Sequence, residues 1–157
     1  MTQASNVALA KAVDASIRRC PPWLVKSARL DRVLVSSRPE IRAQQATFEH
    51  GSRTLYISDQ IPQGLIERAV VHELAHAADD NFGSPHYFSS KWEWKRIHQQ
   101  AQFFDIPKYA QESLEYFADM VAKYVLVGPV KLSISCSHEV QFVEQYVIPV
   151  LRKEFGQ

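Results

Sequence analysis

The feature that most constrains this chain is a long apolar stripe of helical period between Pro62 and Gly83. Its members recur three and four residues apart, which places side chains on one face of an α-helix. They are Leu65, Ile66, Ala69, Val70, Leu74, Ala75 and Ala78. Gly83 predicts the end of this helix. Because so broad a stripe has to be buried, we expect this helix at the centre of the core.

The segments around this helix predict an α+β fold in which helices predominate. A small sheet of about three strands is expected before it, with strands in 28–37, 45–50 and 53–59. Further helices are predicted at 7–19, 90–101 and 111–127, and after residue 137. Ser90 and Ser137 are predicted to cap two of them, and Pro149 to kink or end the last.

Composition places the chain among globular domains. It has 157 residues, 46% of them hydrophobic and 22% charged, so we expect one domain over residues 1–157 that needs no structural metal or disulfide to fold. The formal charge of +1 predicts no nucleic-acid partner. No segment predicts a membrane span or a signal peptide, and we expect a monomer. Cys20 and Cys136 lack CxxC spacing, which suits a reducing compartment and leaves their redox state open.

The predicted central helix carries the sequence His72-Glu73-Leu74-Ala75-His76. Two histidines four residues apart face the same way on a helix and can bind one zinc ion. The carboxylate of Glu73 lies beside them, where it can accept a proton from a zinc-activated water. The pattern therefore predicts one catalytic Zn²⁺ with Glu73 as general base.

A catalytic zinc site needs a third protein ligand, and the sequence offers two. Glu115 lies on a later predicted helix, and Asp119 follows it by one turn, where it could orient a ligating histidine. His86 is the alternative and would make an all-histidine site. Glu115 is favoured because it and Asp119 supply a ligand and its supporting carboxylate in one helical segment.

Together these motifs carry a family resemblance. The stretches HELAHAADDNFG, KWEWKRIHQQ, YAQESLEYFADMV and CSHEVQFVEQYV resemble the catalytic domain of anthrax lethal factor and the Pro-Pro endopeptidases, which have a zincin-like (gluzincin) fold. The resemblance covers roughly residues 55 to 150. It implies zinc ligands at His72, His76 and Glu115, with Glu73 as general base.

The resemblance also implies supporting residues. Asp119 matches an acidic position that supports the ligands, and Asp79 matches an acidic position three residues after the second histidine. The family places an oxyanion-stabilising tyrosine shortly before the ligand glutamate, and Tyr109 is the candidate. Tyr116 is a weaker substitute, because its neighbour Glu115 faces the metal and Tyr116 should point elsewhere.

These expectations combine into a zinc-dependent endopeptidase that hydrolyses an extended segment of a protein substrate. The strand at 53–58 is predicted to lie at the cleft edge and to align the substrate. The resemblance implies a bacterial toxin or effector. The missing signal peptide favours either a cytoplasmic enzyme or delivery by a route independent of a signal peptide. The alternatives are a protease acting on DNA-bound proteins with His86 as third ligand, and a catalytically silent zinc-binding interaction module.

Other aromatic and histidine residues are given structural interpretations. Trp92, Trp94, Phe103 and Phe104 are expected in the core, because aromatic residues of amphipathic helices usually pack inward. Three histidines without ligand-like spacing are expected at the surface or in loops: His50, His98 and His138.

Overall fold

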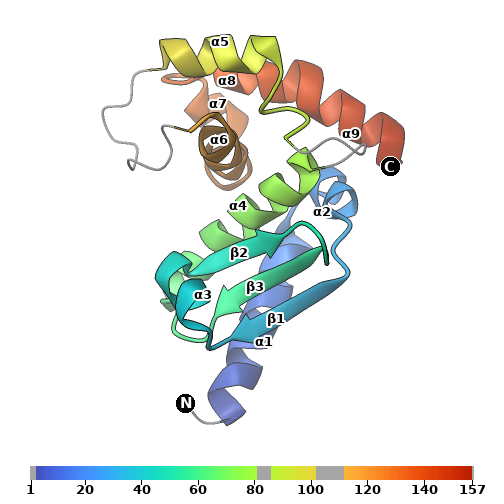
Figure 1. Cartoon of the computed structure of the whole chain (residues 1–157). Helices are drawn as coiled ribbons and strands as arrows, with labels where there is room; N and C mark the ends of the chain where they lie inside the picture. Colours follow the sequence, from blue (N-terminus) through green and yellow to red (C-terminus); the bar gives the residue numbers. More distant parts are fainter. Residues whose placement is uncertain (1–2, 81–85, 102–111, 157) are drawn as a thin grey trace.

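The computed structural model describes residues 3–80, 86–101 and 112–156 (Figure 1). Its elements, in chain order, are α1 (Gln3–Arg19), α2 (Pro22–Ala28), β1 (Arg32–Ser36), α3 (Pro39–Gln44), β2 (Ala46–Glu49), β3 (Thr54–Ser58), the 3₁₀ turn η1 (Gln63–Leu65), α4 (Ile66–Asp79), α5 (Trp92–Gln100), α6 (Ser113–Val127), α7 (Pro129–Leu132), α8 (Ser137–Phe142), the π-helical segment η3 (Val143–Val147) and α9 (Ile148–Phe155). This confirms an α+β fold in which helices predominate over a small three-stranded sheet.

The sheet has the strand order β1-β3-β2. β3 is central: it pairs in parallel with β1, where Val33 lies opposite Leu55, and antiparallel with β2, where Phe48 lies opposite Leu55. Leu55 and Ile57 of β3 are completely buried, as a central strand of this composition should be. β2 is therefore an edge strand, and its outer side faces the cleft described below.

The central helix α4 lies against the sheet and beside α1 (Figure 1). Most of its apolar stripe is buried as predicted, and Val70 and Leu74 have no exposed surface, whereas Leu65, just before the helix, is 45% exposed. The opposite side of α4 packs against α6, so this helix connects the sheet to the C-terminal helices. Residues of its polar face consequently lie where β2, α4 and α6 meet.

An aromatic cluster fixes the position of α6. The ring of Trp94 on α5 is completely buried and lies 5.5 Å from Tyr116, 5.4 Å from Phe117 and 5.1 Å from Phe142, measured between ring centroids. Its indole N–H also donates to the carbonyl oxygen of Ser113, over 3.0 Å. These contacts hold the first turn of α6, which carries Glu115, against α5 and α8.

Prolines begin several helices that the sequence analysis did not predict. Pro22, Pro39 and Pro129 stand in the first turns of α2, α3 and α7, where the missing N–H costs no hydrogen bond. Pro149 was predicted to kink or end the last helix. Pro149 does not end the helix: it lies in the first turn of α9, directly after the wide turns of η3, and α9 continues to Phe155.

Both predicted serine caps are wrong. Lys91 occupies the N-cap position of α5 and makes no side-chain cap, while the hydroxyl of Ser90 lies 3.4 Å from the carbonyl oxygen of Tyr87. Cys136 stands at the N-cap of α8, and Ser137 is already inside the helix. α5 therefore starts two residues after Ser90, at Trp92, and α8 starts at Ser137 itself.

The remaining structural expectations have mixed outcomes. Trp94 is core as predicted, whereas Trp92 is 67% exposed, and Phe103 and Phe104 lie outside the described residues.

Cys20 and Cys136 are free thiols. Burial and nearby Glu67 raise the pKa of Cys20 to about 11, so this thiol is unreactive. Among the described helices, none has the length and apolar character to cross a membrane.

Candidate metal centre

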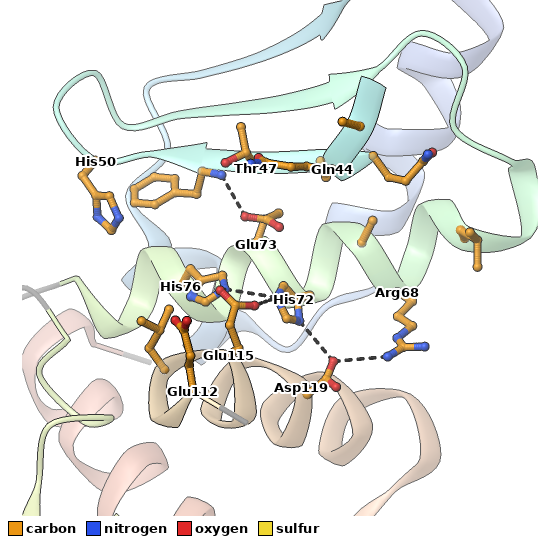
Figure 2. A pocket seen from close by; sticks show the side chains of 17 residues that line it. Gln44, Thr47, His50, Arg68, His72, Glu73, His76, Glu112, Glu115 and Asp119 are labelled. Atoms are coloured by element: carbon orange, nitrogen blue, oxygen red, sulfur yellow. Dashed lines mark hydrogen bonds and ion pairs between the residues drawn. The ribbon is translucent and has the colours of Figure 1, made fainter. Parts of the chain in front are cut away.

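His72, His76 and Glu115 converge on one point between α4 and α6 (Figure 2). The Nε2 atoms of the two histidines are 3.0 Å apart. Glu115 Oε2 lies 3.2 Å from Nε2 of His72, and its Oε1 lies 3.4 Å from Nε2 of His76. The two helical histidines share a face because they are one turn apart, and the aromatic cluster beneath α6 brings the carboxylate to them.

These separations fit a tetrahedral zinc ion. Zn²⁺ bonded to nitrogen and oxygen at about 2.0–2.1 Å in tetrahedral geometry would separate its ligand atoms by about 3.3 Å. The two histidine nitrogens are 3.0 Å apart, and each has one oxygen of Glu115 within 3.4 Å, so the three side chains lie close enough together to share one ion. Two imidazoles and one carboxylate are also the donor set of many catalytic zinc sites, which leave the fourth position open.

Asp119 supports the His72 ligand from the far side of its ring. Its Oδ1 lies 3.3 Å from Nδ1 of His72 and 3.3 Å from Nη2 of Arg68, and the side chain is 1% exposed. A proton held on Nδ1 by this carboxylate leaves Nε2 free to bind a metal. The structure therefore places Asp119 beside Nδ1 of His72, and its role in supporting a metal ligand stays a prediction.

The same contacts shift the pKa values of the site. Burial alone would lower the pKa of His72, but its bonds to Asp119 and Glu115 and the nearby Glu73 carboxylate outweigh burial and raise that pKa to about 9. Burial would raise the pKa of Glu115, yet the two histidines lower it to about 2. Without metal, the positive charge of His72 and the negative charge of Glu115 therefore hold each other in place.

Glu73 points from α4 toward β2 (Figure 2). Its Oε2 accepts a hydrogen bond from the backbone N–H of Phe48 over 2.8 Å. Burial raises the pKa of this carboxyl, against the lowering effect of the two histidines. In the described part of the chain only Oε2 is hydrogen bonded, so Oε1 is left for a solvent molecule beside the metal ligands.

The candidate metal-ligating group, formed by His72, His76 and Glu115, lies in an open cleft of about 710 Å³. α3 and β2 line one side, α4 forms the floor, and the start of α6 lines the other side (Figure 2). The strand 53–58, expected at the cleft edge, is the central strand β3. The edge strand beside the cleft is β2.

Tyr109 lies outside the described residues. Tyr116, the substitute considered for it, is 2% exposed, and its hydroxyl donates to Oε1 of Glu139 over 2.7 Å. Burial and this carboxylate raise the pKa of Tyr116. The expectation that Tyr116 points away from the metal ligands agrees with this contact.

Asp79 and His86 are not part of the metal-ligating group. Asp79 is buried and accepts hydrogen bonds from the backbone N–H groups of Phe88 and Ser89, over 2.6 and 2.9 Å. The Ser89 hydroxyl donates to its other oxygen over 2.5 Å. His86 lies 4.0 Å from Asp79 Oδ2, with its side chain 44% exposed. Asp79 therefore organises the segment after α4, and Glu115 is the third residue beside the two histidines.

Sequence reasoning missed two cleft residues. His50, at the turn after β2, was expected to be an ordinary surface residue, yet it lines the cleft with Nδ1 3.0 Å from Oδ2 of Asp80. Arg68 also lines the cleft. Its position four residues before His72 could have placed it on the ligand face of the helix, whereas only the sheet register brings His50 there.

Comparison with protein-family models, with curated proteins and with solved structures finds no match for this chain. Its function is therefore inferred from the geometry of the site.

Proposed function

We propose that this protein is a zinc-dependent endopeptidase of the gluzincin type, which hydrolyses peptide bonds in an extended segment of a protein substrate. The observation that carries the proposal is the convergence of His72, His76 and Glu115, in which each histidine nitrogen lies within 3.4 Å of a Glu115 oxygen and 3.0 Å from the other nitrogen. Glu73 stands beside that point, in a cleft bordered by a strand edge. The resemblance of the HELAHAAD and EYFAD segments to gluzincins supports the same conclusion.

His72, His76 and Glu115 would hold the metal, and Asp119 would keep His72 in the ligating tautomer. When bound, zinc would lower the pKa of water toward about 7 and polarise the peptide carbonyl. Glu73 would accept the proton of the attacking water and pass it to the leaving amine. The bond from Phe48 N–H orients this carboxylate, and Tyr109 is the proposed donor to the oxyanion.

The outer edge of β2 would bind the substrate backbone. Gln45 accepts from Ser58 N–H over 2.8 Å and so faces β3, whereas Phe48 directs its N–H to Glu73 on the other side. Because backbone groups alternate between the two edges of a strand, Ala46 shares the outward edge of Phe48. Because the Phe48 N–H donates to Glu73, an extended peptide could pair with the backbone groups of Ala46 and the carbonyl oxygen of Phe48 as an additional strand.

Two measurements on purified protein test the proposal: zinc content, and cleavage of a diverse peptide library with and without a chelator. We expect one zinc per chain and chelator-sensitive cleavage. Glu73→Gln should keep the zinc but lose activity by about 10²–10⁴-fold. Glu67→Gln, on the same helix but outside the cleft lining, is the matched control and should cleave normally.

The outcomes separate this proposal from its alternative. Turnover that persists in zinc-loaded Glu73→Gln would exclude Glu73 as general base. Zinc binding by the wild type without cleavage of any library peptide would instead favour a catalytically silent zinc-binding module.

A further inference from the structure

Arg68 stands at one end of the cleft and His50 at the other, with the metal-ligating group between them (Figure 2). Arg68 precedes His72 by one turn of α4, about 5–6 Å along the helix axis. Of the described residues that line the cleft, it alone carries a permanent positive charge. Its side chain is 48% exposed.

The ion pair with Asp119 positions this guanidinium without using up its donors. A single contact joins them, from Nη2 to Oδ1 over 3.3 Å, and Asp119 Oδ1 is shared with His72. A guanidinium has five N–H donors in a planar fork. The neighbouring lining residues are uncharged: Ala43, Gln44, Leu65 and Ala69. The remaining donors are thus available to an anionic group in the cleft.

The direction of β2 decides which end of a substrate reaches Arg68. β2 runs from Ala46 toward His50, so its first residues lie at the Arg68 end of the cleft (Figure 2). A peptide paired antiparallel with β2, the more stable arrangement, would run the opposite way. Its carboxyl end would then pass Arg68. At about 3.3 Å per extended residue, Arg68 is within reach of the first three residues after the scissile bond.

We propose that Arg68 recognises a carboxylate on the carboxyl side of the scissile bond, so that the substrate carries Asp or Glu, or its own terminal carboxylate, within three residues of the cut. This inference rests on the proposed peptidase function and specifies its substrate class. A planar guanidinium binds a carboxylate through two parallel hydrogen bonds, a geometry that a neutral amide cannot match.

Binding tests the inference without turnover. The probes are tripeptide amides with an amino-terminal hydroxamate, which would bind the zinc and direct the peptide to its carboxyl side. Each carries Glu or Gln at the first, second or third residue, and affinity for the zinc-loaded protein is measured by calorimetry. A further pair ends in a free carboxylate or an amide.

We expect an acidic probe to bind about tenfold tighter than its neutral partner at one position, less at high salt, and with no difference in Arg68→Gln. Arg68→Lys keeps a charge beside Asp119 but lacks the fork, so the preference should shrink while zinc is retained. Arg96→Gln removes an equal charge on α5, outside the cleft lining, and should keep the full preference.

Equal affinities for every acidic and neutral pair would overturn the inference while leaving the peptidase proposal intact. A preference that survives in Arg68→Gln would do the same. Failure of the wild type to bind zinc, or of the zinc-loaded protein to bind any hydroxamate, would overturn both.

Discussion

Nδ1 of His72 lies 3.3 Å from Oδ1 of Asp119, while Nε2 on the other side of the same ring lies 3.2 Å from Oε2 of Glu115. One imidazole therefore joins two carboxylates from a single face of α6, one turn apart. The first carboxylate can hold a proton on the ring, and the second can share a metal with it. This relationship makes the basicity of His72 depend on Asp119.

Asp119→Asn should weaken zinc binding by about 10–100-fold, because the amide keeps the shape of the carboxylate but not its charge. Competition with a fluorescent zinc chelator would measure the change. Asp14→Asn removes an exposed carboxylate that, among the described residues, pairs with Arg18 on α1, and it should leave zinc affinity unchanged. Equal affinities for Asp119→Asn and wild type would show that Asp119 does not tune the ligand.

Glu115→Ala should abolish stoichiometric zinc binding, whereas His86→Ala should retain it. The reason is geometric: both oxygens of Glu115 lie within 3.4 Å of the histidine nitrogens, while His86 contacts Asp79 and packs 6.1 Å from the ring of His50. Metal analysis after dialysis, with circular dichroism to verify folding, would check both variants. Zinc retained in a folded Glu115→Ala and lost in His86→Ala would reverse the assignment.

The sequence was sufficient to predict what depends on local pattern. The helical stripe of α4 and the strand-rich segment before it are local signals, and the spacings 72/76 and 115/119 follow from helix period alone. Strand order is different, because it depends on long-range pairing. The choice between β2 and β3 as the edge beside the cleft could not be made from composition, since both are short and rich in β-branched or aromatic residues.

Proline positions show another limit of local reading. The sequence analysis predicts no helix that begins at Pro22, Pro39 or Pro129, although proline is favoured at the first position of a helix. Only the packing of the residues that follow decides whether a proline ends one helix or begins the next. The position of His50 could not be predicted locally either, because the pairing of β2 with β3 is what brings the turn after β2 to the cleft.

Asp79→Ala should destabilise the protein by about 2–4 kcal/mol, because it leaves the N–H groups of Phe88 and Ser89 buried without their acceptor. Asp79→Asn keeps one acceptor oxygen and should cost less. Urea unfolding of the zinc-free variants would measure both. Zinc affinity of folded Asp79→Asn should match wild type, and a large loss there would give Asp79 a role in the metal site.

The stability of the zinc-free protein should fall as the pH rises, whereas the stabilisation that zinc provides should grow. The pKa of His72, about 9 in the folded zinc-free protein, is raised above its unfolded value of about 6.5. Its contribution to stability is therefore complete below pH 6.5 and is lost as the pH rises through 9, by on the order of 3 kcal/mol. Zinc-free protein should consequently unfold more easily at pH 8 than at pH 6.5.

Zinc binding requires a neutral His72, so the metal must displace this proton. Apparent zinc affinity should rise about tenfold per pH unit between pH 6.5 and 8, with about one proton released per zinc bound. Because bound zinc stabilises the fold by mass action, the increase in melting temperature on adding zinc should grow over the same range. Calorimetry in buffers of different ionisation enthalpy would count the proton. Zinc binding without proton release would mean that His72 is already neutral and that Asp119 and Glu115 do not hold it charged.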